Sequence, residues 1–338
     1  MRIGQNPEKE NYRKIEYKQH RIIIPVYIPE TNQEYFKGLF DVLKTSLNSL
    51  FLTINRENTA VTIINNACKT EVSVYLDELL SKNKIDKIVK LSRNLGKIST
   101  VLSEAKASFE PLITIADADV FYFNNWENEV IKVFNTFPYT GVVAPLPTPN
   151  LAFYCNTSTW LTLFFKINKE SIVSDKSFQL FEEGVGNDMI FETKKVNWKK
   201  GQYILSKNEI KACVGAGHFV ATYRREVLNK LPFKKPEYVF KNGDEVFFLD
   251  QPIDKLGGHR LSTIETFVYH LGNNIPKWVS HYQHQIPEET QEIKQQKIIK
   301  KDFFAFFVVP YRILAWVVSM IPYKIKIKLL SLLKKMKI

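Results

Sequence analysis

The sequence is poor in cysteine, and the three that it has, Cys68, Cys155 and Cys213, lie far apart along its 338 residues. An odd number without close pairs gives neither a disulfide framework nor the ligand spacing of a zinc or iron–sulfur site. Residues 1–20 are polar and lack the apolar run of a secretory signal. We therefore expect a reducing compartment, the cytoplasm, and a solvated N-terminal extension over 1–20.

Acidic residues are nearly missing from the end of the chain. From Lys294 onward, eleven Lys or Arg residues face one acid, Asp302, so ten of the twelve net positive charges lie there. A nucleic-acid-binding protein more often spreads basic residues over a folded face, so no nucleic acid partner is expected. A basic tail mixed with large apolar residues favours an anionic membrane surface instead.

Residues 21–134 alternate between short β-branched runs and segments with apolar residues at helical spacing. The pattern predicts strands at 21–27, 61–64, 87–91 and 111–116, and helices at 35–54, 71–82 and 99–108. This alternation predicts an α/β fold with a mainly parallel sheet flanked by helices. Ligands of such sheets bind beyond the carboxyl ends of the strands.

The later part of the body has a less regular pattern. Residues 145–212 hold several prolines and many aromatic residues, and we expect an irregular insertion that shapes the acceptor side. Beyond it, the pattern predicts strands at 219–223 and 263–269, and helices at 224–230 and 244–256. The glycines 257–258 suit the end of the last helix.

Asp117-Ala118-Asp119 directly follows the predicted strand 111–116. An Asp-x-Asp turn is usually solvated or caps a helix, but its place at the carboxyl end of a buried strand favours a ligand site. Two carboxylates there suit a hard divalent cation, Mn²⁺ or Mg²⁺, which can also contact diphosphate oxygens. Such a cation neutralises the charge that a departing diphosphate develops.

Three weaker features follow the same logic. The turn 93–97 offers a glycine for close approach to phosphate and a lysine for charge, or it is an ordinary surface turn. The acidic pair Asp244-Glu245 could supply a general base, or it could simply favour a helix N-terminus. His270, at the end of a predicted strand, could complete a metal site or serve packing alone.

The order and spacing of these features resemble the family 2 glycosyltransferases of the GT-A fold, over about residues 21–275. The matching segments, in chain order, are Pro25, Asn65-Asn66, Asn94-x-Gly96-Lys97, Asp117-x-Asp119, Gly215-Ala216-Gly217, Gly243-Asp244-Glu245 and Tyr269-His270-Leu271-Gly272-Asn273. The resemblance implies transfer of a sugar from a nucleotide diphosphate to a hydroxyl group, with inversion and with a divalent cation, Mn²⁺ or Mg²⁺.

The resemblance also implies roles for individual residues. Asp117, Asp119 and His270 match the metal site, with Asp119 as the more direct ligand, and Asp244 or Glu245 matches the base. Donor binding is implied for Pro25, Tyr27, Asn65, Asn66, Asn94, Gly96, Lys97, Asp117, Ala118 and Asp119. Asn65-Asn66 stand where the family usually has an Asp that reads the nucleotide base. A UDP-sugar is favoured as donor, and a GDP-sugar is the alternative.

Two other functions have to be considered. A sugar-phosphate nucleotidyltransferase would need a glycine-rich basic loop after the first strand, and residues 25–29, Pro-Val-Tyr-Ile-Pro, do not provide it. A catalytically inactive, membrane-bound protein that binds nucleotide sugars is the other alternative. The expected acceptor is a glycan or a lipid-linked molecule, in the synthesis of bacterial cell-surface polysaccharide or glycolipid.

The tail begins with a nearly apolar stretch at 303–322, which Pro310 and Arg312 interrupt. Residues 323–338 then place lysines on one helical stripe and apolar residues on another, as in a basic amphipathic helix. We expect 303–338 to bind an anionic membrane, on the inner face of the cell membrane. The expected division is 1–20, a catalytic domain over 21–290 (donor half 21–134, acceptor half 135–290), and a membrane-associating tail over 291–338.

Overall fold

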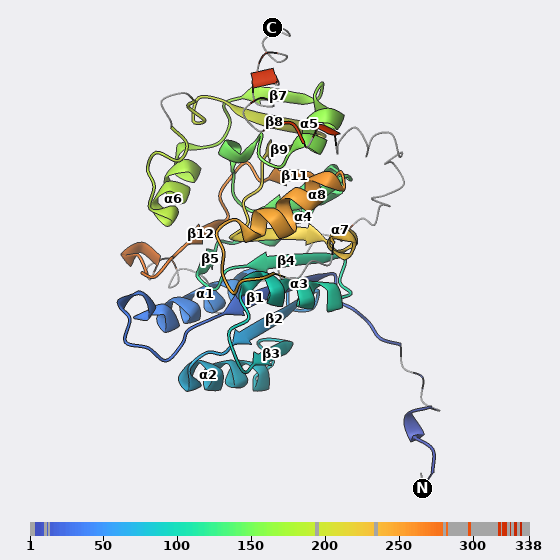
Figure 1. The fold of residues 1–338 in the computed structure, drawn as a ribbon, viewed down its shortest axis with the longest axis vertical. Coiled ribbons are helices and arrows are strands. Elements are labelled where there is room, and N and C mark those ends of the chain that lie inside the picture. Colours follow the sequence, from blue (N-terminus) through green and yellow to red (C-terminus); the bar gives the residue numbers. More distant parts are fainter. Residues whose placement is uncertain are drawn as a thin grey trace.

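The computed structural model shows an α/β body built around one large sheet (Figure 1). It describes residues 4–9, 12, 14–192, 196–232, 236–279, 282, 297–298, 317–318, 320–322, 325, 328–329 and 332. The expected catalytic domain is therefore described almost completely up to residue 279. The expected membrane tail, 303–338, lies mostly outside the described residues.

The first part of the body alternates strands and helices, as its sequence pattern predicts. After η1 (Pro7–Lys9), its elements are β1 (His20–Val26), η2 (Glu34–Phe36), α1 (Leu39–Thr53), β2 (Thr59–Asn66), α2 (Thr70–Ser81), β3 (Lys87–Leu91), α3 (Lys97–Ala107), β4 (Leu112–Ala116), β5 (Val120–Tyr122), α4 (Trp126–Thr136) and β6 (Thr140–Ala144). Every residue of β2 and β4 is buried. Their Val and Ile side chains suit strands that are covered on both faces.

Residues 145–212 are more regular than the sequence indicates, so the expectation of an irregular insertion is wrong. They form η3 (Pro149–Leu151), α5 (Thr157–Leu163), β7 (Ile167–Glu170), α6 (Asp175–Val185), β8 (Gln202–Lys207) and β9 (Ile210–Val214). Strand β7 escapes recognition because it is short and largely polar, with only Ile167 buried. Helix α6 starts at a clear signal, since the Ser174 side chain accepts a hydrogen bond from the Ser177 N–H.

The last part of the body departs from its predicted boundaries at one strand. Its elements are β10 (Val220–Arg224), α7 (Arg225–Lys230), the π-helical η4 (Val246–Asp250), α8 (Gln251–Lys255), β11 (His259–Ser262) and β12 (Val268–His270). The single strand expected at 263–269 is wrong, because a turn separates β11 from β12 and the Thr263 hydroxyl donates to the carbonyl of Glu265 within it. The helix expected at 244–256 is confirmed, because helical backbone runs without a break from 244 to 255, with the π-helical turn η4 before α8.

The main sheet has ten strands among the described residues, in the order β3-β2-β1-β4-β10-β6-β11-β9-β8-β7. Figure 1 shows this order as a stack from β3 at the bottom to β7 at the top. Strands β10, β9 and β7 run against the other seven. The predicted fold class is thus confirmed: an α/β protein with a large, mostly parallel sheet flanked by helices.

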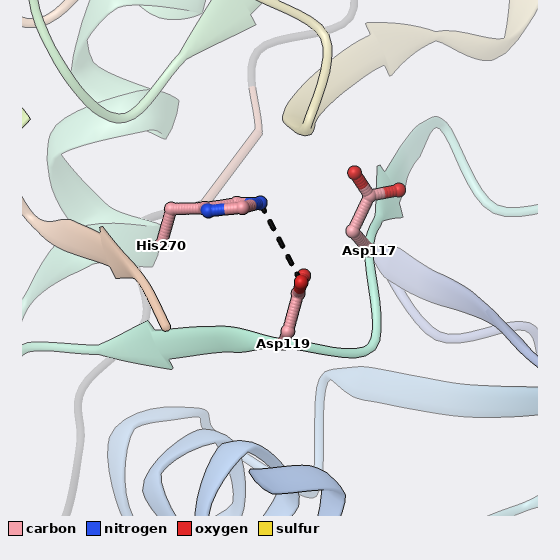
Figure 2. A group of neighbouring side chains, drawn as sticks. All are labelled: Asp117, Asp119 and His270. Atoms are coloured by element: carbon pink, nitrogen blue, oxygen red, sulfur yellow. Dashed lines mark ion pairs between the residues drawn. The ribbon is translucent and has the colours of Figure 1, made fainter. Parts of the chain in front are cut away.

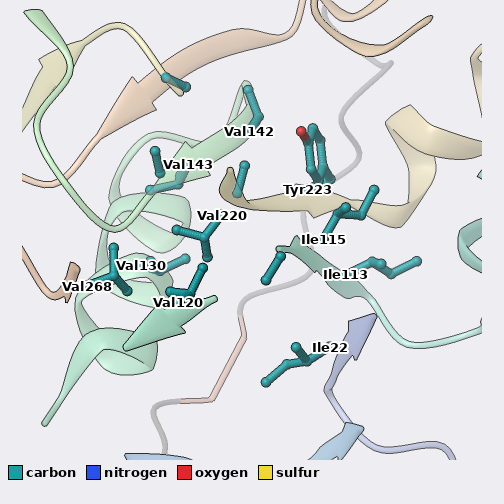
Figure 3. Close-up of a cluster of buried hydrophobic side chains, with 14 of the residues drawn as sticks. Ile22, Ile113, Ile115, Val120, Val130, Val142, Val143, Val220, Tyr223 and Val268 are labelled. Atoms are coloured by element: carbon teal, nitrogen blue, oxygen red, sulfur yellow. The ribbon is translucent and has the colours of Figure 1, made fainter. Parts of the chain in front are cut away.

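A separate two-stranded ribbon of β5 and β12 leaves the sheet where β4 ends. Its residues help to close the core beside β4, β10 and β6. Figure 3 shows Val120 and Val268 of the ribbon near Val220 of β10, among the buried aliphatic side chains of the central strands. The core therefore fixes the point where β4 passes into the ribbon, and this point carries Asp117-Ala118-Asp119.

Among the described residues, no helix combines the length and the apolar character that crossing a bilayer requires. The chain after the body passes along its surface at residues 297–298, where the Ile298 N–H donates to the Gln19 side chain and the Asn135 amide donates to the Lys297 carbonyl.

Candidate active site

The Asp117–Asp119 turn is fastened at both of its ends. The Asp117 N–H donates to the Phe219 carbonyl at 2.7 Å, and the Asp119 carbonyl accepts from the Leu271 N–H at 2.7 Å. The first bond joins the turn to the start of β10, and the second joins it to the end of β12. Ala118 lies between them, half-buried and packed on the core. Two segments distant in sequence thus set the direction of both carboxylates.

Asp117, Asp119 and His270 come together as the sequence comparison implies. Each offers a ligand atom, and these atoms lie within 4.8 Å of one another. Figure 2 shows His270 facing Asp119, with Nε2 and Oδ2 separated by 3.5 Å. Two carboxylates and one imidazole are a donor set that suits Mn²⁺ and similar divalent cations, since these accept both oxygen and nitrogen ligands.

The burial and hydrogen bonding of the Asp119 carboxylate test whether a cation fits this site. Its Oδ1 is buried and has no hydrogen-bond partner among the described residues. Burial raises the pKa of Asp119; His270 opposes this shift, and Asp117 adds to it, so that the pKa lies above its ordinary value. A buried carboxylate oxygen without a donor is costly, and a bound cation would remove that cost. The residues present therefore fit a metal ion.

His270 is oriented by the backbone of α6. Its Nδ1 lies 3.1 Å from the Gly184 carbonyl oxygen, which can only accept, so Nδ1 carries a proton and Nε2 is the ring nitrogen that faces Asp119. Metal-binding histidines are commonly held this way. A Cβ on Gly184 would lie 3.0 Å from the His270 carbonyl oxygen and 3.2 Å from its nitrogen. Glycine at this position thus permits the close approach.

Helix α6 is in turn anchored to the segment that leads into β12. The Glu265 carboxylate accepts from the hydroxyls of Ser174 and Ser177, at 2.6 and 2.7 Å. The Ser177 hydroxyl also accepts from the Thr266 N–H. These bonds fix α6 against β12 and so support the contact between Gly184 and His270.

Asp117, Asp119 and His270 are called the metal group below. Lys97 connects this group to the acidic pair. Its ammonium lies 2.5 Å from Asp117 Oδ1 and 3.3 Å from Glu245 Oε1. Burial lowers the pKa of Lys97, but the carboxylates of Asp117 and Glu245 outweigh this and raise the pKa above its ordinary value. Asp117 therefore has the Lys97 ammonium beside it, while His270 is the only basic side chain within 4 Å of the Asp119 carboxylate among the described residues. This difference favours Asp119 as the more direct ligand.

The turn before Lys97 is built from side-chain amides. Asn94 Oδ1 accepts from the Asn66 amide and from the Gly96 N–H, both at 2.8 Å, and Asn66 Oδ1 accepts from the Leu95 N–H. Gly96 has a φ of 79°. A Cβ there would stand 2.0 Å from the Val239 carbonyl oxygen. Asn66, Asn94 and Gly96 thus shape the turn that presents Lys97.

The remaining candidates for donor binding lie nearby along β1 and β2. Asn65 is buried, and its amide group bonds the Ser73 hydroxyl and the Cys68 N–H, which stabilises the turn after β2. Pro25 lies in β1 opposite Ile64. Tyr27 follows β1, is 40% exposed, and packs edge-on against Phe36. Among the described residues, neither Pro25 nor Tyr27 has an ion pair or hydrogen bond to the carboxylates.

The two acids of the pair differ in their surroundings. Glu245 faces Lys97, as described above, whereas the Asp244 carboxylate has no ion pair or hydrogen bond in the part of the chain that the structure describes. The π-helical η4 begins directly after Glu245. π-Helical turns are rare and are frequent at functional sites.

The structure also contains a buried ion pair, next to Asp244 and Glu245, that the sequence did not predict. Asp250, at the end of η4, lies 2.6 Å from Arg260 Nη1 and 3.3 Å from His218 Nδ1, while Arg260 Nη2 donates to the Ala216 carbonyl. Burial raises the pKa of Asp250, but Arg260 and His218 hold it below its ordinary value. The pair joins η4 to the loop 215–218. The glycines of that loop are visible in the sequence, but the arginine follows a helix end and gives no signal.

Comparison with known proteins decides the family. The family model described as "Glycosyl transferase family 2" matches residues 22–231, more than half of the chain. The chain belongs to glycosyl transferase family 2. Both the candidate metal turn and the loop 215–218 lie within the matched segment. No curated protein sequence matches this glycosyltransferase.

Several solved structures resemble this glycosyltransferase. Staphylococcus aureus TarS 1–349 with UDP-GlcNAc is 11% identical, with 91% of this chain and 69% of that chain covered and a TM-score of 0.44. The mannosyltransferase PcManGT from Pyrobaculum calidifontis, with GDP-Man and Mn²⁺, is 12% identical, with coverages of 94% and 74% and a TM-score of 0.41. GalNAc-T7 with UDP, GalNAc and Mn²⁺ is 14% identical, with coverages of 76% and 44% and a TM-score of 0.46. In another TarS structure, the match covers only 38% of that chain.

Proposed function

We propose that this family 2 glycosyltransferase moves a sugar from a nucleoside diphosphate to a hydroxyl group, with inversion and with a divalent cation. The observation that carries the proposal is the linked set at the end of β4. Asp119 and His270 present a metal group, and Lys97 joins Asp117 of that group to Glu245. This arrangement supports a reaction that uses a cation, a positive charge for phosphate and a base around one point.

In this reaction the acceptor oxygen attacks the anomeric carbon of the donor, and the bond from that carbon to the diphosphate oxygen breaks. The electron pair of the broken bond leaves with the nucleoside diphosphate. The proton of the acceptor hydroxyl passes to a carboxylate of the acidic pair. A bound cation neutralises charge on the leaving diphosphate. One displacement of this kind inverts the anomeric centre.

The chain's own residues then have separate tasks. Asp119 and His270 would hold a divalent cation, with His270 oriented by the contact of its Nδ1 with the Gly184 carbonyl. Lys97 keeps Asp117 and Glu245 in place, and its ammonium lies where donor phosphates would meet the carboxylates. Asn66 and Asn94 hold the turn that carries it. Tyr27, partly exposed after β1, is proposed to contact the nucleotide base.

The two alternative functions fit the site less well. A nucleotidyltransferase needs backbone N–H groups of a glycine-rich loop for the phosphates of its substrate. Here the chain after β1 is tied to the next turn instead, because the Ile28 carbonyl accepts from the Lys69 N–H. An inactive binding protein would not need a carboxylate such as Glu245 beside the metal group.

A thermal-shift screen with calorimetry tests the proposed donor. With Mn²⁺ present, UDP or a UDP-sugar is expected to raise the melting temperature, because a ligand at 100 times its Kd adds about 2.7 kcal/mol to the free energy of unfolding. GDP is the comparison. Without divalent cation, the shift is expected to shrink strongly. If neither nucleotide bound with Mn²⁺ or Mg²⁺, the proposed donor class would be rejected.

We also propose that the acceptor is a glycan or a lipid-linked molecule of the bacterial cell surface, and that the tail brings the enzyme to the inner face of the membrane. Ile325, Leu329 and Leu332 have helical backbone, and each is about half exposed. Their spacing places them on one side of a helix. Lys328 lies among them, as expected for a helix that meets an anionic surface.

Flotation with vesicles of equal parts phosphatidylglycerol and phosphatidylcholine tests this proposal. The wild-type protein is expected to float with the vesicles at low salt and to dissociate as salt rises. Replacing Ile325, Leu329 and Leu332 together by Asp is expected to weaken binding at least about tenfold, because three apolar contacts are lost. Val74→Asp, an exposed apolar position on α2, is the matched control. Equal flotation of the triple variant would exclude this face as the anchor.

A further inference from the structure

A pocket of about 560 Å³ lies beside the metal group, between α6 and the far end of the β5–β12 ribbon. Its volume is in the range of small-ligand sites. One side comes from α6 and the other from the ribbon and the segment that follows it. The lining residues are Phe123, Asn124, Lys176, Gln179, Leu180, Glu183, Thr266, Phe267, Trp278 and Tyr282. None of them is a candidate for binding the metal or the donor or for acting as the base, although the Thr266 N–H helps to anchor α6.

The ribbon side of the pocket is an aromatic wall. The rings of Phe123 and Trp278 lie nearly parallel, with an angle of 17° and centroids 6.1 Å apart, and Tyr282 meets Phe123 edge-on at 5.3 Å. All three are only partly buried, although they pack on the cluster around Phe121. Aromatic faces left partly in water gain free energy when a ligand with C–H groups covers them.

The helix side of the pocket is polar. Lys176, Gln179 and Glu183 are exposed on one face of α6, and the Gln179 amide donates to the Glu183 carboxylate at 2.7 Å. One ammonium and one carboxylate leave this side without net charge, which disfavours a phosphate or a polyanion. An alkyl chain would bury these groups without partners. A neutral ligand with many hydroxyl groups satisfies both sides.

We propose that this pocket binds sugar units of the acceptor, and that the acceptor is an uncharged oligosaccharide. Sugar rings combine a face of C–H groups, for Trp278 and Phe123, with hydroxyls for Gln179, Glu183 and Asn124. This inference rests on the proposed function, because the pocket would bind the part of the acceptor that extends beyond the hydroxyl to which the sugar is transferred.

The ribbon gives the pocket a defined distance from the metal group. His270 pairs with Val120 at the near end, and the Phe123 N–H donates to the Phe267 carbonyl at the far end. Phe123 lies four positions after Asp119, which corresponds to about 13 Å of strand. A single sugar is shorter than this, so an acceptor that reaches both places has several units. Glu183 of the pocket also precedes Gly184, which orients His270.

The test is binding of maltohexaose, chitohexaose and laminarihexaose, measured by saturation-transfer NMR and calorimetry, with UDP and Mn²⁺ present. At least one hexasaccharide is expected to bind the wild-type protein more tightly than its monosaccharide does. Trp278→Ala is expected to raise the Kd about tenfold, equivalent to about 1.4 kcal/mol. Gln179→Trp fills the pocket from an exposed helix position and is expected to have the same effect without removing a packed ring.

Phe165→Ala is the matched control, because that ring is 79% exposed and lies outside the pocket. The control and both variants are expected to bind UDP with Mn²⁺ as the wild-type protein does. Absence of binding by all three hexasaccharides, or unchanged binding to both variants, would overturn the inference while leaving the proposed function intact. Failure of the wild-type protein to bind UDP with Mn²⁺ would instead reject the proposed function.

Discussion

Replacing Asp119 by Asn is expected to lower the rate of sugar transfer about 10³-fold, because the lost metal contact is worth several kcal/mol in the transition state. The same change should remove the increase in melting temperature that Mn²⁺ gives to the wild-type protein. The reason lies in the buried Oδ1 of Asp119, which has no hydrogen-bond partner among the described residues. An amide there keeps the shape of the side chain but withdraws the negative charge that attracts the cation.

A second measurement separates metal loss from misfolding. Without Mn²⁺, Asp119→Asn is expected to be at least as stable as the wild-type protein, since burial raises the pKa of Asp119 and the ionised carboxylate is thus disfavoured in the fold. Asp77→Asn, which removes an exposed carboxylate paired with Lys90 on the sheet edge, is the matched control and should retain activity. Full activity of Asp119→Asn with Mn²⁺ would contradict the metal assignment.

The donor side of the fold could be predicted because its signals are local. Runs such as Ile22-Ile23-Ile24 and Val61–Ile64 are apolar enough to identify buried parallel strands, and the carboxyl ends of such strands mark the ligand side. Asp117, Asp119 and His270 could be assembled from the family's order of motifs, although 150 residues lie between the turn and the histidine. The structure places them within 4.8 Å.

The supporting contacts could not be predicted, because each one joins residues that no local pattern connects. The Gly184 carbonyl holds His270 from 86 positions away, and Glu265 holds α6 through two serines about 90 positions earlier. A glycine in the last turn of a helix looks like a helix end, and two serines look like a cap. Only tertiary packing shows that they orient a metal ligand.

The acidic pair gives the second large effect. Glu245→Gln is expected to lower kcat about 10²- to 10⁴-fold, the range that a general base contributes. Asp244→Asn is expected to lower kcat less than about tenfold, because Asp244 is not expected to accept the proton. Sequence comparison left both acids open. The structure distinguishes them, because Lys97 ties only Glu245 to the metal group through Asp117, at 3.3 and 2.5 Å.

Single-turnover kinetics at saturating donor separates the two roles that Glu245 could have. If Glu245 accepts the acceptor's proton, Glu245→Gln keeps its affinity for UDP with Mn²⁺ and loses only the chemical step. If Glu245 serves only to hold Lys97, the variant loses donor affinity instead, because the ammonium shifts fully to Asp117. Asp244→Asn is the control on the neighbouring residue. A larger loss in Asp244→Asn than in Glu245→Gln would move the base to Asp244 and would make the contact between Lys97 and Glu245 a purely structural one.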